Sequence, residues 1–241
     1  MKIEHTATRR LYLDLLKRSV TDLIYSEQDP GRIEGRVWPE RAHTMIGLPR
    51  LDSLEETIEN VLRDDVPGDL IETGVWRGGA CIFMRGMLRA YGVTGRAVWL
   101  ADSFAGVPPP NVERYPADAG MSLHEARVLA IPLETVQANF ARYDLLDEQV
   151  RFLKGWFRDT LPRAPVERLA VLRLDGDLYE STMVALQNLY PKVSIGGYVI
   201  VDDYGAIEAC AKAVQDFRRE NDVDDPLVTI DWTGVLWRRT R

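Results

Sequence analysis

Residues 69–80 (DLIETGVWRGGA) constrain the fold more than any other stretch of this chain. Leu70 and Ile71 close a short buried strand, a glycine-rich turn follows, and an apolar helix begins at about Gly79. This succession is typical of the opening of a nucleotide-binding βαβ unit. The glycines are spaced G-x-x-x-G-G and not G-x-G-x-x-G, which disfavours a dinucleotide, and Glu72 suits a ligand with a cationic end. The alternative is a turn with only a structural role.

The other elements are predicted from short apolar runs that alternate with longer helical patterns. Further strands are expected at 96–101, 149–154, 169–174 and 197–201, with a closing hairpin over 227–239. Helices are expected at about 10–25, 51–64, 79–88, 132–146, 180–190 and 206–220. The fold class is therefore α/β: a Rossmann-like, seven-stranded, mostly parallel sheet with one antiparallel strand, plus N-terminal helices.

The region before the first strand is predicted as two helices joined by a polar loop. The first helix is expected to bury a stripe made of Leu11, Leu15, Leu16, Leu23 and Ile24. Asp52 or Ser53 is expected to cap the second helix, over 51–64. We assign residues 1–50 to an N-terminal helix and lid segment, and residues 51–241 to the main domain.

Composition and charge exclude several classes of protein. The net charge is −7 with scattered basic residues, so nucleic-acid binding is not expected. No stretch approaches the roughly 20 apolar residues that span a bilayer, and the N-terminus lacks the apolar core of a signal peptide. Cys81 and Cys210 both fall in predicted helices, which favours a reducing cytoplasm over a disulfide framework.

Acidic residues follow four of the five predicted parallel strands: Glu72, Asp102, Asp175 with Asp177, and Asp202 with Asp203. The carboxyl ends of parallel strands meet at one rim of the sheet, where ligands bind. Clustered carboxylates repel one another unless a cation joins them, and no basic partner of this cluster stands out in the sequence.

Asp175, Asp202 and Asp203 are therefore the predicted ligands of Mg²⁺ or a similar hard cation, at the rim and outside the core. The alternative is that some of these acids are helix caps or solvated loop residues. A zinc site is excluded because the three histidines are far apart and no Cys-x-x-Cys motif exists.

Two further features fit a nucleoside ligand. Asp102 stands where folds of this type hold ribose hydroxyls, although it could instead cap a helix. The aromatic pair Trp156 and Phe157 follows the strand at 149–154, where it could stack an adenine or simply pack in the core.

At these residues the chain resembles the macrocin O-methyltransferase family. The resemblance rests on PERAHTMIG, ETGVWRGGA, ADSF, GWFRDTLP, LRLDGDLYEST and VIVDDY, and it extends from about Leu11 to Arg239. It implies a class I methyltransferase domain over residues 51–241. The implied activity is methylation of a sugar hydroxyl on a glycosylated natural product, dependent on S-adenosylmethionine and Mg²⁺, as in the deoxysugar steps of antibiotic biosynthesis in actinomycetes. In the family, the loop that covers the acceptor is longer than the stretch between Asp29 and Trp38 here. The resemblance therefore does not decide the identity of the acceptor.

The resemblance also assigns roles to residues. It implies the metal ligands Asp175, Asp202 and Asp203 and a general base at Asp177, with His124 as a rival base. Bound to Mg²⁺, a sugar hydroxyl would become easier to deprotonate. The cofactor residues expected from the motifs are Thr44, Met45, Glu72, Thr73, Gly74, Trp76, Arg77, Gly78, Ala80, Asp102, Ser103, Gly155, Trp156, Phe157 and Asp175. The expected acceptor contacts are Glu34, Trp38, Met45 and Tyr179.

Residues 26–44 form the segment that is expected to close over the acceptor, while the preceding helix is expected to help form a homodimer. The alternative is a tether that touches no ligand. Two other functions stay open: a catechol-type metal-dependent O-methyltransferase, which usually employs a lysine base, and a nucleotide-binding scaffold without activity. Loss of turnover with intact cofactor binding in a variant lacking Asp177 would favour the enzyme.

Overall fold

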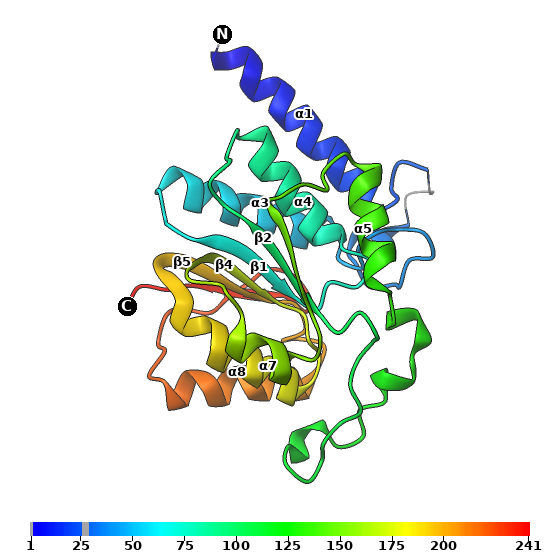
Figure 1. The fold of residues 1–241 in the computed structure, drawn as a ribbon, viewed down its shortest axis with the longest axis vertical. Coiled ribbons are helices and arrows are strands. Elements are labelled where there is room, and N and C mark those ends of the chain that lie inside the picture. The colour runs from blue at the N-terminus through cyan, green and yellow to red at the C-terminus, as the bar shows by residue number, and fades with distance from the viewer. Residues whose placement is uncertain (1, 26–28) are drawn as a thin grey trace.

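The computed structural model describes residues 2–25 and 29–241, and it contains one seven-stranded sheet with helices on both faces (Figure 1). The strand order is β3-β2-β1-β4-β5-β7-β6. The strands are β1 (Asp69–Thr73), β2 (Val98–Asp102), β3 (Val150–Lys154), β4 (Leu169–Leu174), β5 (Val193–Val201), β6 (Val228–Thr229) and β7 (Val235–Arg238). Only β7 runs antiparallel to its neighbours, which confirms the predicted fold class.

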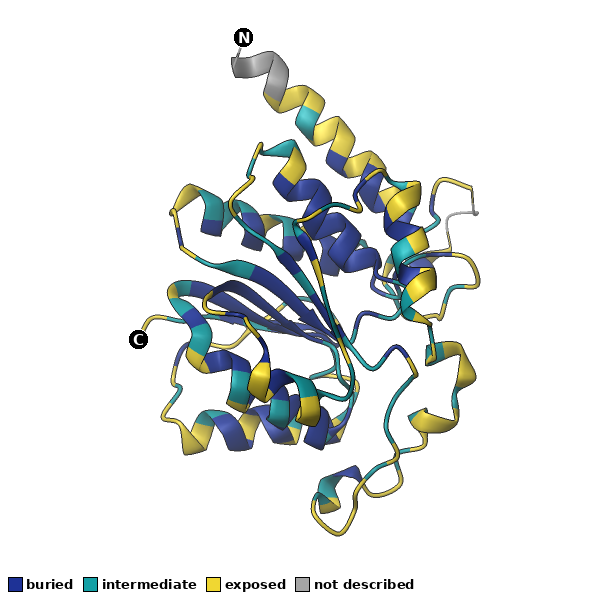
Figure 2. Ribbon diagram, in the orientation of Figure 1, coloured by how far each residue is buried: buried dark blue, intermediate teal, exposed yellow. Residues whose placement is uncertain are grey.

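Two hydrophobic cores cover the two faces of this sheet, seen as dark blue ribbon in Figure 2. Helices α1, α3, α4 and α5 pack on one face, and α7 with α8 on the other. The helices are α1 (Lys2–Val20), α2 (Pro30–Ile33), α3 (Leu48–Arg63), α4 (Gly79–Ala90), α5 (Leu133–Arg142), α6 (Phe157–Thr160), α7 (Tyr179–Leu189) and α8 (Glu208–Glu220). No helix in the described ranges is both long and apolar enough to cross a bilayer.

The start of the chain differs from its prediction. Helix α1 buries Leu13, Leu16 and Val20, whereas Leu11 and Leu15 of the predicted stripe are 70% and 53% exposed. Ile24 is also exposed, while Leu16 and Leu23 are buried as expected. The leucines of α1 allow two different faces at helical spacing, and packing against α4 selects one of them.

Helix α3 begins earlier than predicted, because Gly47 and not Asp52 or Ser53 precedes its first turn. Pro49 occupies the first turn, where its missing N–H costs nothing. Asp52 instead pairs with the buried Lys17 of α1, which joins the two helices. Asp52, which the sequence suggested as a helix cap, therefore forms an ion pair between two helices.

The carboxyl ends of β1, β2, β4 and β5 lie side by side, as the acidic pattern predicted. Thr73 pairs with Ala101 and Leu174, and Leu174 pairs with Val201, so the next residue of each strand falls at the same rim. Gly74 permits this close approach: its φ is +86°, and a Cβ there would lie 1.7 Å from the Asp175 carbonyl oxygen.

Candidate active site

A cavity of about 280 Å³ opens at this rim of the sheet. Its walls combine the strand ends with the segment after residue 29, the loop after β2 and the β6–β7 turn. The predicted residues that line it are Trp38, Thr44, Met45, Glu72, Gly74, Trp76, Ala80, Asp102, Ser103, Trp156, Phe157, Asp175, Asp177, Asp202 and Asp203. Ligand sites of open α/β sheets lie at this edge.

The glycine-rich turn is fixed by the carboxylate of Asp102. Its Oδ2 accepts a hydrogen bond from the Val75 N–H (2.7 Å), and its Oδ1 accepts one from the Phe104 N–H (2.7 Å). Burial raises the pKa of Asp102, and these N–H groups oppose the rise. Trp76 and Phe104 both adopt left-handed backbone conformations, a strain that accumulates at functional sites. Asp102 therefore joins the turn after β1 to the loop after β2 at one end of the cavity. Its carboxylate binds N–H groups of these loops and does not cap a helix.

Arg173 corrects the expectation that the acidic cluster lacks a basic partner. Its guanidinium, 2% exposed, pairs with Glu72, with Asp175 (2.8 Å) and with Asp202. Glu72 also accepts a hydrogen bond from the Cys81 thiol (2.9 Å), and burial raises its pKa despite the charge of Arg173. The carboxylate of Glu72 thus has a cationic partner within the protein, where the sequence predicted one on the ligand.

Asp177 and Asp203 are neighbours, and neither carboxylate forms an ion pair with an arginine in the described part of the chain. The Asp203 Oδ2 accepts a hydrogen bond from the Asp177 N–H (3.3 Å), and Asp177 has a left-handed φ of +59°. Burial raises the pKa of Asp177 to about 6, helped by the negative charge of Asp202. Burial and the neighbouring carboxylates raise the pKa of Asp203 well above its usual value.

The predicted metal ligands meet at one point. Asp175, Asp202 and Asp203 each offer a carboxylate oxygen, and these atoms all lie within 4.8 Å of one another. A set of three carboxylate oxygens, with no sulfur or nitrogen, suits a hard cation such as Mg²⁺. Burial, and then the negative charges of Asp177, Asp175 and Asp202, raise the pKa of Asp203 despite the charge of Arg173. The residues present therefore fit a divalent cation.

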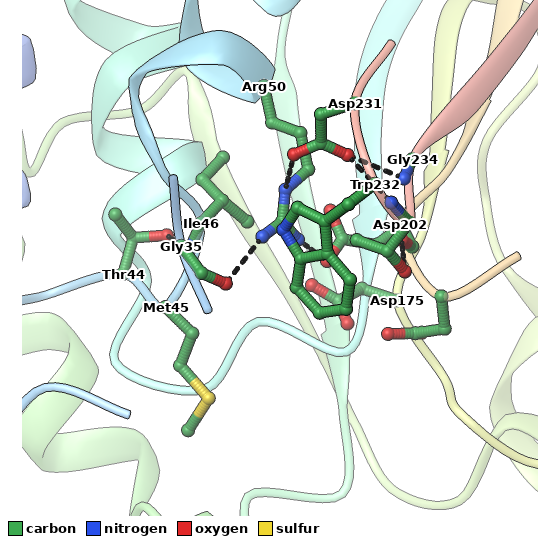
Figure 3. Close-up of polar contacts among 12 residues, drawn as sticks. Gly35, Thr44, Met45, Ile46, Arg50, Asp175, Asp202, Asp231, Trp232 and Gly234 are labelled. Atoms are coloured by element: carbon green, nitrogen blue, oxygen red, sulfur yellow. Dashed lines mark hydrogen bonds and ion pairs between the residues drawn. The ribbon is translucent and has the colours of Figure 1, made fainter. Parts of the chain in front are cut away.

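Asp202 lies deeper than predicted, because it is 5% exposed and held from two sides. Arg173 contacts its Oδ1, and Arg50 of α3 contacts its Oδ2. Figure 3 shows Arg50 reaching from α3 toward Asp202, the Gly35 carbonyl and Asp231. No local pattern in the sequence pointed to Arg50, since 152 positions separate it from Asp202.

Several predicted site residues lie outside the cavity lining. Thr73 is buried beneath the turn, with a hydroxyl that has no hydrogen-bond partner in the described structure. The Gly155 N–H donates a hydrogen bond to the Asp102 carbonyl, and the Arg77 guanidinium donates to the carbonyls of Glu40 and Ala42. Gly78 directly precedes the first turn of α4.

Of the expected acceptor contacts, Trp38 and Met45 line the cavity and two do not. Glu34 pairs with Arg36 on the surface, and the Tyr179 hydroxyl bonds Asp216 (3.0 Å). His124, the rival base, lies in the short helical turn Leu123–Glu125 and is not among the residues that line the cavity. Residues of the lining that the sequence did not single out include Arg50, Arg158, Glu180, Ile207 and Trp232.

Comparison with known proteins identifies the chain. The model of the family described as Macrocin-O-methyltransferase (TylF) matches residues 2–239. The chain belongs to the macrocin O-methyltransferase family. It is therefore a methyltransferase, and the family resemblance read from the motifs is confirmed.

Two curated relatives are similar to this chain over nearly their whole length. The 8-demethyl-8-(2,3-dimethoxy-alpha-L-rhamnosyl)-tetracenomycin-C 4'-O-methyltransferase of Streptomyces olivaceus is 58% identical, over 96% of this chain and 94% of its own. The mycinamicin III 3''-O-methyltransferase of Micromonospora griseorubida is 52% identical, over 95% of this chain and 96% of its own. The solved structure of the O-methyltransferase NovP is 55% identical, covers 97% of this chain and 100% of its own, and superposes with a TM-score of 0.94.

Proposed function

We propose that the enzyme transfers the methyl group of S-adenosylmethionine to a sugar hydroxyl of a glycosylated natural product, assisted by a divalent cation. The observation that carries the proposal is the single cavity in which Asp102, Asp177 and the Asp175–Asp202–Asp203 cluster meet. The names of both curated relatives, which describe O-methylation at numbered sugar positions, support the acceptor class.

The two ends of the cavity suit the two substrates. Asp102, Gly74 and Trp156 surround the end nearest β1, β2 and β3, where the donor nucleoside would lie. Asp102 would accept hydrogen bonds from the ribose hydroxyls, and Trp156 would pack on the adenine. Trp38 and Trp232 border the other end and would receive the acceptor.

The catalytic step needs a base and a fixed orientation. Asp175, Asp202 and Asp203 would hold the cation, which when bound supplies charge that favours the ionised form of a hydroxyl. Asp177 would accept the hydroxyl proton, and its pKa of about 6 suits a base at neutral pH. Arg173 keeps Glu72, Asp175 and Asp202 in one arrangement throughout.

A catechol-type enzyme is disfavoured by the lining of the cavity. That class usually employs a lysine base, and no lysine is among the cavity residues in the described part of the chain.

We also propose that the chain forms a homodimer, in which a second copy would cover the exposed Leu11 and Leu15 of α1. Analytical sedimentation of the whole chain tests that proposal.

Incubation with methyl-labelled S-adenosylmethionine, MgCl₂ and candidate acceptors tests the function. The acceptors are mycinamicin III and 8-demethyl-8-(2,3-dimethoxy-α-L-rhamnosyl)-tetracenomycin C, with catechol as the comparison. We expect label on a glycoside and none on catechol, and we expect excess EDTA to abolish the transfer. Label on catechol alone, or full turnover after exhaustive EDTA treatment, would overturn the proposal.

A further inference from the structure

Arg50 is a buried cation whose partners come from three separate segments. It sits in α3, its side chain is 7% exposed, and its Nη2 donates to the Gly35 carbonyl (3.0 Å). Its Nη1 pairs with Asp202 at the end of β5, and its Nε lies 3.0 Å from Asp231 in the β6–β7 turn. The one guanidinium therefore joins four parts of the chain at the edge of the cavity (Figure 3).

We propose that Arg50 is a positioning residue that holds the acceptor-side wall of the cavity together. The wall is the set Gly35, Arg36, Trp38, Trp232 and Thr233, all of which line the cavity. The term acceptor-side rests on the proposed function. The wall itself is defined by contacts in the protein.

The topology places this wall away from the donor end. Asp102 ends β2, whereas Asp202 follows β5 and Trp232 precedes β7, and the sheet order puts β1 and β4 between β2 and β5. Arg50 touches neither Asp102 nor Gly74 in any hydrogen bond of the described structure. Its loss should therefore disturb one end of the cavity and spare the other.

The hairpin turn depends on the same cluster. The Asp231 Oδ1 accepts hydrogen bonds from the Thr233 N–H (3.0 Å) and the Gly234 N–H (2.8 Å), which leaves its Oδ2 to face Arg50. The Thr233 hydroxyl donates to the Asp202 carbonyl (2.9 Å). Asp231 thus shapes the turn through its Oδ1 and links the turn to Arg50 through its Oδ2.

The lid segment meets this turn directly. The Trp232 Nε1 donates to the Glu34 carbonyl (3.1 Å), and the Arg36 guanidinium lies 4.8 Å from the centre of the Trp232 ring. Gly35 has a φ of +67°, and a Cβ there would lie 2.5 Å from the Arg50 Nη2. The fork of an arginine bridges three partners at fixed angles, which the single ammonium of a lysine does not reproduce.

Trypsin cleavage after the exposed Arg36 reports whether the wall is closed. We would digest the whole, metal-free chain under native conditions and follow the Arg36–Val37 bond by mass spectrometry. In Arg50→Ala this bond should be cut about tenfold faster than in the wild type, because local opening controls cleavage. Methylguanidinium at millimolar concentration should slow the cleavage of Arg50→Ala more than that of the wild type in the same solution, because it fills the vacated site, whereas its binding to the arginine pocket of trypsin slows both digests equally.

Matched variants distinguish a local effect on the cavity wall from a general loss of stability. Arg63→Ala removes an exposed arginine of the same helix that pairs with Asp64, and it should leave the rate within about twofold of the wild type. Asp231→Asn keeps the oxygen that shapes the turn and removes the charge that faces Arg50, so it should speed cleavage by about threefold. This variant decides the matter if Arg50→Ala does not fold.

Calorimetry with S-adenosylhomocysteine gives the second readout, and Arg50→Ala should bind it within about threefold of the wild type. Unchanged cleavage in both Arg50→Ala and Asp231→Asn would overturn the proposal, as would faster cleavage of Arg50→Ala that methylguanidinium slows no more than it slows cleavage of the wild type. If the wild type fails to bind S-adenosylhomocysteine, the proposed function fails, while the cleavage rates still judge the role of Arg50.

Discussion

Replacement of Arg173 by methionine should be the most destabilising single change at the site. Methionine keeps an unbranched apolar side chain, so the loss reports the charge more than the packing. Arg173 is 2% exposed, and its removal leaves Glu72 and Asp202, with side chains 3% and 7% exposed, without this partner. Breaking a buried ion pair from one side costs about 3–5 kcal/mol, against a total stability of roughly 5–15 kcal/mol for a domain.

Urea unfolding followed by circular dichroism measures this cost. Arg168→Met, an exposed arginine just before β4, is the matched control and should change the free energy of unfolding by less than about 0.5 kcal/mol. A loss below about 1 kcal/mol in Arg173→Met would refute the idea that this arginine compensates the buried carboxylates.

Three further predictions concern the donor end, the pH dependence and the lid. Asp102→Ala should weaken S-adenosylhomocysteine binding in calorimetry by about 1–3 kcal/mol, the cost of unpaired polar groups; unchanged affinity would contradict this. Burial lowers the pKa of His43, so folding should lose stability as the pH falls through about 6.5, and His43→Gln should reduce that slope in urea titrations. Cleavage within residues 29–44 should slow when S-adenosylhomocysteine and Mg²⁺ are added together; equal rates would favour a tether. Residues 26–28 of the proposed lid lie outside the described residues.

The sequence predicted the sheet well because buried parallel strands are almost continuously apolar. The limits of β4 match the predicted run 169–174, and the one antiparallel strand was expected from the hairpin around Asp231. Strand β5 begins at Val193, before the predicted residue 197, because it includes polar and glycine positions near a shift in register with β4. Periodicity alone does not locate such an irregular start.

The acidic rim was predictable, but the cations that organise it were harder to find. Arg173 left one signal in the sequence, a charge inside the apolar run LAVLRL, which requires a buried acidic partner on a neighbouring strand. Arg50 left none, because its partners are distant in the chain. For the same reason Asp202 was expected at an open rim, whereas two arginines bury it. Its replacement by alanine should therefore cost stability as well as cation binding.

Turnover of Asp177→Asn tests the proposed chemistry most directly. Asparagine keeps the shape of the side chain and cannot take the proton of a hydroxyl at neutral pH. Methyl transfer to the glycoside that the wild type accepts should fall by about 10²–10⁴-fold, the usual contribution of a general base. Binding of S-adenosylhomocysteine should stay within about threefold in the same preparation, because Asp177 follows β4, whereas Asp102, the residue proposed to bind the ribose, ends β2 on the other side of β1. Wild-type turnover in Asp177→Asn would contradict the assignment of this residue as the base.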